Sequence, residues 1–131
     1  MIQKCENFCK AVVRLSEALT DLEKQPNSTV IRDGVIQRFE FTFELAWKSL
    51  RDYMADQGAD MTSIVFSKQV FKAAYAANLI DDSQVWLDML DSRNITSHVY
   101  DDEQANQVAI AIRDRYITAF TTLALLYQHA D

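Results

Sequence analysis

The sequence predicts a single all-α domain over residues 1–131 on the basis of length, composition and periodicity. A chain of 131 residues fits one domain and can bury roughly two-thirds of its unfolded surface. Strand-rich folds need many tight turns, which draw on glycine and proline, yet only Gly34, Gly58 and Pro26 are present. Apolar residues instead recur at steps of three and four, the period of amphipathic helices.

The first predicted helix runs from Ile2 to Lys24, because its apolar residues alternate at steps of three and four and so share one face. This apolar stripe consists of Cys5, Phe8, Val12, Leu15, Leu19 and Leu22. Pro26 cannot continue a helix, and Asn27 or Ser28 can cap the next one. We therefore expect the chain to turn shortly after Lys24.

The second predicted helix runs from Val30 to Gln57 and ends at Gly58, a residue suited to the left-handed backbone after a helix. Phe41 and Leu45 widen its apolar arc, so we expect a central helix covered on two sides. An ionic stripe at every fourth position follows the same helix: Glu40, Glu44 and Lys48. Such a stripe is typical of a solvated or ion-paired edge, and a role in a site is the alternative.

Three more helices are predicted in the second half of the chain. A short one is expected from Ser67, as its cap, to a stop at Asn78. Asp82 or Ser83 can cap the next, and Asp101 with Gln104 can form the capping box of the last. The aromatic and aliphatic residues expected in the core are Phe39, Phe43, Trp47, Trp86, Leu87 and Leu90.

Charge and hydropathy limit the possible partners. The net charge of −6 opposes non-specific attraction to phosphate backbones, so any RNA contact must be local; the same charge also serves solubility. No basic flank precedes an apolar run at the start, and no segment approaches the ~20 apolar residues that span a bilayer. We therefore expect a cytoplasmic protein without membrane contact.

No cofactor or metal is expected. Cys5 and Cys9 lie four residues apart, but a structural zinc site needs four ligands, and His98 and His129 are the only histidines. Reduced, partly buried cysteines are the favoured interpretation. With two glycines the chain has no glycine-rich phosphate loop, so ATP is expected to bind a partner.

Ionisable residues continue an apolar stripe near position 90. Leu90, Asn94 and His98 follow one another at steps of four, and Arg93 lies on the adjacent row. Charged groups on such a face need partners or must line a cleft. For an isolated histidine, a satisfied structural network is the more common explanation, with a functional site as the alternative.

The segment from Arg93 to Tyr100 matches the R-x4-H-x-Y motif of the HEPN superfamily. Residues 38–48 (RFEFTFELAWK), Gly58, residues 79–82 (LIDD) and 86–90 (WLDML) also resemble the nucleotidyltransferase substrate-binding family, which lies within the HEPN group and includes the HepT toxins of MntA/HepT systems. The resemblance covers most of residues 30–101. Family members often have glycine where this chain has Asn78, which tolerates the same left-handed backbone.

This resemblance implies an up-and-down four-helix bundle with a short additional helix, assembled as a symmetric homodimer. It also implies a metal-independent endoribonuclease in which Arg93 and His98 are catalytic. Arginine can hold two phosphate oxygens, and histidine can transfer protons near neutral pH. On a regular helix, residues five apart point about 140° apart. Either the helix ends near Ser97, or a groove between two protomers receives both residues, with Asn94 orienting the imidazole.

Tyr100 has two interpretations. A tyrosine just past a helix end is commonly an anchor with a wet hydroxyl. In HepT proteins the equivalent tyrosine accepts AMP from ATP through the nucleotidyltransferase antitoxin, which implies the same modification here. Two functions follow from the resemblance: a ribonuclease toxin neutralised by a minimal nucleotidyltransferase, or a non-catalytic subunit that presents a substrate to that enzyme. The acidic balance mildly favours the second.

Overall fold

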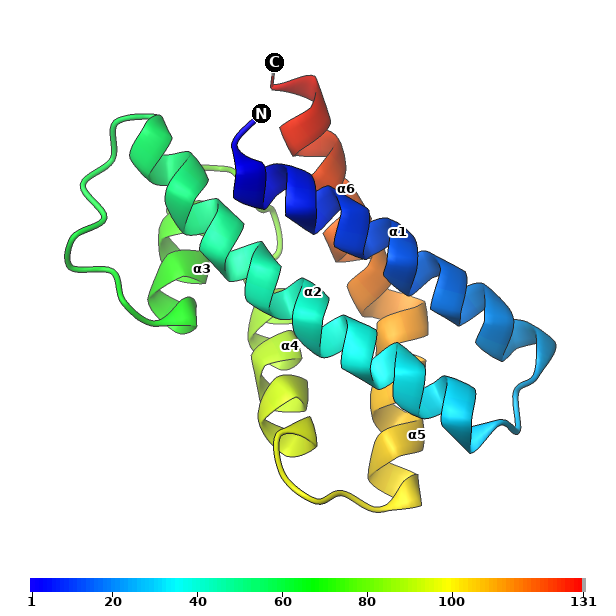
Figure 1. Ribbon diagram of the computed structural model, residues 1–131. Helices are drawn as coiled ribbons and strands as arrows, with labels where there is room; N and C mark the ends of the chain where they lie inside the picture. Colours follow the sequence, from blue (N-terminus) through cyan, green and yellow to red (C-terminus); the bar gives the residue numbers. More distant parts are fainter. Residues whose placement is uncertain (131) are drawn as a thin grey trace.

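The structure, a computed structural model that describes residues 1–130, consists of helices joined by short loops (Figure 1). The elements are α1 (Gln3–Lys24), α2 (Thr29–Asp56), α3 (Ser67–Ala76), α4 (Ser83–Thr96), α5 (Asp102–Ala111), the π-helical η1 (Ile112–Tyr116) and α6 (Ile117–His129). The last three form one continuous helix. Residues 1–130 contain no strand, so the all-α prediction is confirmed.

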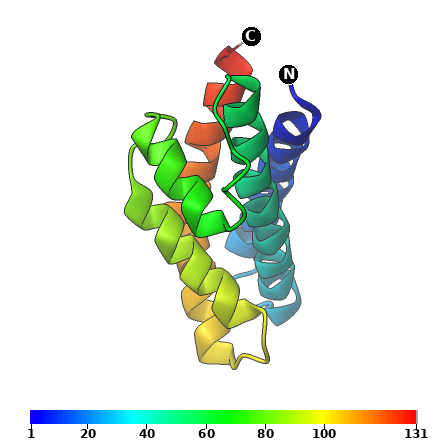
Figure 2. The same cartoon turned by 90° about the vertical axis from the view of Figure 1, so that its left-hand side faces the viewer.

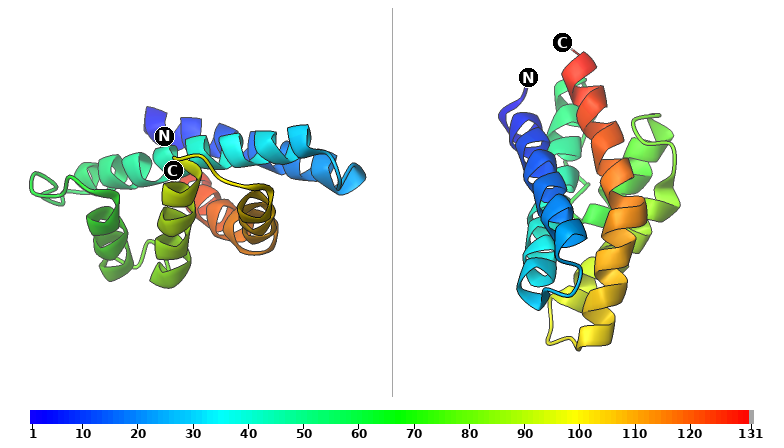
Figure 3. Two further views of the ribbon diagram at one scale, coloured as in Figure 1. Left: turned by 90° about the horizontal axis from the view of Figure 1, so that it is seen from below. Right: turned by 90° about the vertical axis from the view of Figure 1, so that its right-hand side faces the viewer.

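The helices form two layers, seen from below in Figure 3. The antiparallel pair α1 and α2 makes one layer, and α3, α4 and the α5–α6 helix make the other (Figures 2 and 3). Helix α2 contacts α1, α3, α4 and α5, which agrees with its predicted central position. Phe41 of α2 is nevertheless 64% exposed, so that face lacks the cover that was expected. Neither layer contains, within residues 1–130, a helix long and apolar enough to cross a membrane.

Aromatic rings fill the space between the two layers. Phe39 lies 5.4 Å from Tyr116 and 6.1 Å from Phe120, centroid to centroid, and Trp86 lies 5.6 Å from Phe120. Burial of such rings supplies most of the apolar area that stabilises a small domain. The predicted core residues Phe39, Phe43 and Trp86 are buried as expected.

Three other residues predicted in the core are only partly buried: Trp47, Leu87 and Leu90. At about 100° per residue, Leu90 lies to the side of the α4 face that buries Met89, and Leu87 lies nearly opposite that face. Trp47 is at an edge of α2, where its indole N–H donates to Glu44 (3.1 Å). Periodicity identified the correct helices but placed these side chains too close to the centre of the apolar arc.

The predicted helix boundaries follow from local capping. Ser28 Oγ accepts the N–H of Ile31 (3.1 Å), and Asp82 accepts N–H groups at the start of α4. Gly58 and Asn78 have positive φ angles of 97° and 60°, the left-handed conformation predicted for both. These positions confirm the expected stops after α2 and α3.

The predicted cap of α3 is wrong by one residue. Ser67 is the first residue of α3 rather than its cap, which is Phe66. The Gln69 side-chain oxygen accepts the N–H groups of Val65 (3.1 Å) and Phe66 (3.0 Å). An amide side chain from the first turn of the helix therefore satisfies the backbone N–H groups of the two residues that precede it.

Both cysteines are free thiols that contact neighbouring helices. Cys5 Sγ lies 3.8 Å from the carbonyl oxygen of Ser49, and Cys9 Sγ lies 3.7 Å from that of Ala124. Burial raises the pKa of Cys5 to about 11, which keeps it protonated at neutral pH. Among residues 1–130, no three histidine, cysteine or acidic side chains are grouped closely enough to hold a metal ion.

Candidate functional site

The motif residues lie where α4 ends. The last helical residue is Thr96, and Ser97 is its C-cap, with its N–H bonded to the carbonyl of Arg93. Residues 97–101, called here the motif loop, then lead into α5. Arg93 therefore lies on the last turn of the helix and His98 lies outside it. The 140° separation expected of a continuous helix does not apply to this pair.

Two glutamates of α2 hold Arg93. Its Nη1 lies 2.9 Å from Glu40 Oε2, its Nε lies 3.9 Å from Glu44 Oε1, and Thr96 Oγ1 donates to the same Glu40 oxygen at 3.3 Å. The side chains of Arg93 and Glu40 are 28% and 26% exposed. The predicted ionic stripe is therefore an ion-paired edge, and one of its partners is the motif arginine.

The guanidinium of Arg93 is only partly satisfied by these contacts. Nε is buried and has no hydrogen-bond partner within residues 1–130. Within residues 1–130 the guanidinium donates one hydrogen bond, from Nη1 to Glu40. Arginine has five N–H donors, so the pair with Glu40 leaves donors that an anionic ligand can use.

His98 and Asn94 are both exposed, and Val99 between His98 and Tyr100 is fully exposed. The Asn94 carbonyl accepts the Ser97 hydroxyl (2.8 Å), which tightens the end of α4. Within residues 1–130 no hydrogen bond joins the Asn94 side chain to the imidazole. The predicted orienting role of Asn94 therefore stays a prediction.

Tyr100 is partly buried and packs against the core. Burial raises the pKa of its phenol, the carboxylates of Asp33 and Glu40 raise it further, and Arg32 opposes them. These three charged residues all belong to α2, and the partly buried ring packs against the core as an anchoring residue would. At neutral pH the hydroxyl is protonated, so any transfer to it needs an external base.

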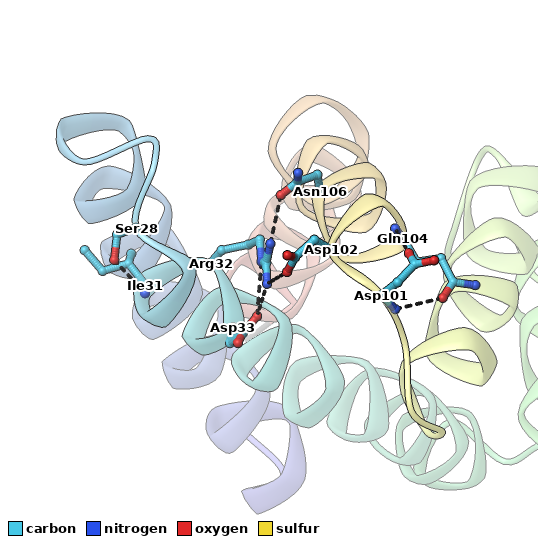
Figure 4. Close-up of polar contacts among 8 residues, drawn as sticks. All are labelled: Ser28, Ile31, Arg32, Asp33, Asp101, Asp102, Gln104 and Asn106. Carbon is cyan, nitrogen blue, oxygen red and sulfur yellow. Dashed lines mark hydrogen bonds and ion pairs between the residues drawn. The ribbon is translucent and has the colours of Figure 1, made fainter.

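Arg32, which no sequence motif indicated, fixes the far end of the motif loop (Figure 4). Its guanidinium donates to Asp102 (3.0 Å) and Asn106 (3.1 Å) on the first turns of α5 and to neighbouring Asp33 (3.0 Å). Only 10% of its side chain is exposed. Arg32 lies four residues before the buried Ile36, on the core-facing row of α2. A charged residue on that row is the sequence signal that could have indicated a buried ion pair here.

A second local contact stabilises the same end of the loop. Asp101 accepts the N–H of Gln104 (2.8 Å), and the Gln104 side chain accepts the N–H of Asp101 (3.1 Å), which confirms the predicted capping box (Figure 4). The motif loop is thus held at its start by the contact of Arg93 and Thr96 with Glu40, and at its end by Arg32 and this box.

We expect Arg32→Ala to lower the free energy of unfolding by about 1–2 kcal/mol, because it leaves polar partners unpaired and a space against the core. This value is below that for a fully buried ion pair, since Asp33 and Asp102 are more than half exposed. Urea denaturation followed by circular dichroism measures the change. Arg113→Ala is the matched control, because Arg113 pairs on the surface with its neighbour Asp114. Equal midpoints for the two variants would contradict the anchoring role.

Comparisons with known proteins cover nearly the whole chain. The sequence profile described as "Nucleotidyltransferase substrate binding protein like" matches residues 3–128. A Haemophilus influenzae protein called "Probable ribonuclease HepT" is 35% identical over 97 residues, which are 72% of this chain and 66% of that protein. The match thus spans just under two thirds of that relative's length.

Two solved structures share the fold. A Haemophilus influenzae structure, described as the fold of a substrate binding domain of a nucleotidyltransferase, superimposes with a TM-score of 0.80 and 26% identity over 95% of this chain and 99% of that one. A Thermus thermophilus protein gives 0.68 and 29% identity over 88% and 98% of the two chains.

Proposed function

The chain belongs to the nucleotidyltransferase substrate binding protein like family, and from this premise we propose that it is a HepT-like, HEPN-type ribonuclease toxin that a cognate minimal nucleotidyltransferase neutralises. One observation carries the proposal: α4 ends between Arg93 and His98. The end of the helix removes the 140° separation of a continuous helix, and we propose that the cation on its last turn and the exposed imidazole in the loop act on one phosphate group. The 35% identity to a protein called a probable ribonuclease supports it.

The chemistry that suits these two residues is metal-independent cleavage of RNA. The 2′-oxygen forms a bond to the adjacent phosphorus, and the bond from phosphorus to the 5′-oxygen breaks. His98 is proposed to transfer one of the two protons, either the one that leaves the 2′-hydroxyl or the one that the 5′-oxygen gains, and solvent water exchanges the other. Arg93 is proposed to bind the non-bridging oxygens as their negative charge grows, through the donors that Glu40 leaves unused.

A homodimer is proposed to complete the groove, with its two-fold axis near residues 93–98. Ile95 is 42% exposed and Val99 fully exposed beside the motif, while Leu90 on the same helix is only partly buried. Exposed apolar side chains of this kind are typical of surfaces that a second copy covers. We expect light scattering at micromolar concentration to give twice the mass of one chain. A monomer would remove the second protomer from the site.

A non-catalytic subunit that presents a substrate to the nucleotidyltransferase is the second candidate. The net charge of −6 favours it, and so does the pairing of Arg93 with Glu40 and Glu44, which lowers the attraction of this surface for phosphate. The description of the Haemophilus influenzae structure as a substrate binding domain supports the same alternative. Both candidates require a nucleotidyltransferase partner, but only the toxin makes that partner necessary for survival.

Growth after expression of the chain alone separates the two candidates. We expect the wild-type chain to arrest growth, and co-expression of the partner nucleotidyltransferase to restore it. His98→Ala, expressed to the same level, is expected to leave growth normal without the partner. Normal growth with the wild-type chain alone, at a level shown by immunoblot to match the variant, would favour the subunit.

A further inference from the structure

A shallow hollow lies between the outer faces of α1 and α2, away from the motif loop. Its volume is about 240 Å³, and the larger side chains that line it are Lys10, Arg14, Arg38 and Phe41. We call it the Phe41 hollow. Phe41 is 64% exposed, which leaves the ring accessible on the face of α2 that was expected to be covered.

The cations around the Phe41 hollow are unequally neutralised. Lys10 lies 3.4 Å from Glu6, and Arg14 lies 2.9 Å from Glu17. Arg38 donates from Nη1 to the main-chain carbonyl of Arg14 at 2.6 Å and has no carboxylate partner within residues 1–130. Its guanidinium is therefore fixed at the rim by a neutral acceptor and keeps its full positive charge.

An accessible aromatic ring beside an unneutralised guanidinium suits single-stranded nucleic acid. A base can stack on the ring, since every base has a π-face, and the adjacent phosphate can accept hydrogen bonds from arginine. Nucleic acid is favoured over an apolar protein segment, because Arg38 has no carboxylate partner within residues 1–130 and a phosphate can supply the missing negative charge. The positive charge of Arg38 is confined to one place, which is the condition that a net charge of −6 sets for any RNA contact.

We propose that the Phe41 hollow is an RNA-binding subsite in which one base stacks on Phe41 while a neighbouring phosphate pairs with Arg38; as a substrate subsite, it rests on the proposed ribonuclease function. The same turn of α2 contacts both places. Glu40 pairs with the motif residue Arg93, and Phe41, the next residue, lines the hollow on another face of that turn. Consecutive helical residues point about 100° apart on a cylinder roughly 10–12 Å across with its side chains. A single-stranded RNA that crosses α2 at this turn can therefore contact Phe41 and Arg93 at the same time.

The test measures binding and cleavage separately. Binding of a fluorescein-labelled single-stranded RNA to the full chain carrying His98→Ala is followed by anisotropy in EDTA at several salt concentrations. We expect a further Phe41→Ala change to raise the Kd for RNA by a factor between about five and about a hundred. This is the range for loss of one base stack. Phe41→Trp should retain most of the affinity, because it preserves the stacking surface.

Arg38→Gln tests the phosphate contact. It should weaken binding and reduce the slope of log K against log salt by about 0.7, the value for one phosphate contact on a single strand. Leu125→Ala and Lys24→Gln are the matched controls. Leu125 is an exposed apolar residue of α6, and Lys24 is an exposed cation with no carboxylate partner in the described part of the chain, so both should bind as the parent does.

Each outcome decides one of the two claims. If the wild-type chain cleaves RNA while the Phe41 and Arg38 variants bind and cleave normally, the subsite is wrong and the ribonuclease function stands. If binding depends on Phe41 and Arg38 but the wild-type chain cleaves nothing, the hollow binds RNA and the ribonuclease function is wrong. Absence of RNA binding by folded protein overturns the subsite. A change from dimer to monomer in Phe41→Ala would assign the hollow to contact between copies and would also overturn it.

Discussion

Replacement of His98 by alanine is expected to lower the rate of RNA cleavage about a hundred- to ten-thousand-fold, because it removes the group that transfers a proton in the transition state. His98 is exposed in the motif loop and has no hydrogen bond within residues 1–130, so its loss should leave the helical circular dichroism spectrum and the urea midpoint unchanged. The measurement is cleavage of a labelled single-stranded RNA in EDTA. His129→Ala is the matched control, because His129 is an exposed histidine at the end of α6.

Arg93→Ala is expected to abolish cleavage as completely, since it removes the cation proposed to stabilise charge on the phosphate. This variant also removes the cation that Glu40 and Glu44 share, so its stability has to be measured beside its activity. Arg93→Lys separates charge from geometry: it keeps one positive charge but lacks the planar fork that binds two oxygens. We expect it to fold normally and to cleave far more slowly than the wild-type chain. Folded Arg93 or His98 variants with wild-type activity would refute the ribonuclease assignment.

Tyr100→Phe is expected to eliminate modification of this chain by its partner. If the nucleotidyltransferase acts by AMPylation, incubation with that enzyme, ATP and magnesium should raise the mass of the wild-type chain by one or more AMP units. The Tyr100→Phe variant should gain no mass and should stay toxic with the partner present. In this proposal the added phosphate would neutralise the toxin by bringing negative charge and bulk beside Arg93 and His98.

The structure makes this test more demanding. The ring of Tyr100 packs against the core, and burial with the carboxylates of Asp33 and Glu40 raises the pKa of its hydroxyl. A partner that modifies Tyr100 therefore has to supply the base that takes the phenolic proton. Ser97 is the control hydroxyl, because it is exposed but bonded to the Asn94 carbonyl, and Ser97→Ala should still be labelled. Equal labelling of the Tyr100→Phe variant would leave Tyr100 as an anchor and limit control to binding.

The sequence by itself determined the helices and their ends, because these depend on interactions between near neighbours. The stop at Gly58, the cap at Asp82 and the box of Asp101 with Gln104 each depend on residues within a few positions, so a local pattern carries them. The motif from Arg93 to Tyr100 was likewise legible as a contiguous segment. The π-helical segment η1 is an exception, because the apolar periodicity did not predict it. Tyr116, at the end of this segment, has its hydroxyl 2.7 Å from the hydroxyl of Ser92.

Only the tertiary structure decided how charges meet across helices and which apolar residues stay uncovered. Arg93 pairs with Glu40, 53 residues away in the sequence, and Arg32 pairs with Asp102, 70 residues away. No rule of local spacing predicts contacts between residues so far apart. Phe41 satisfies the apolar pattern of a buried residue yet is exposed, because burial depends on whether another helix packs on that face. Periodicity gives each helix its faces, while the free energy of packing between distant helices decides which of them are buried and which ions pair.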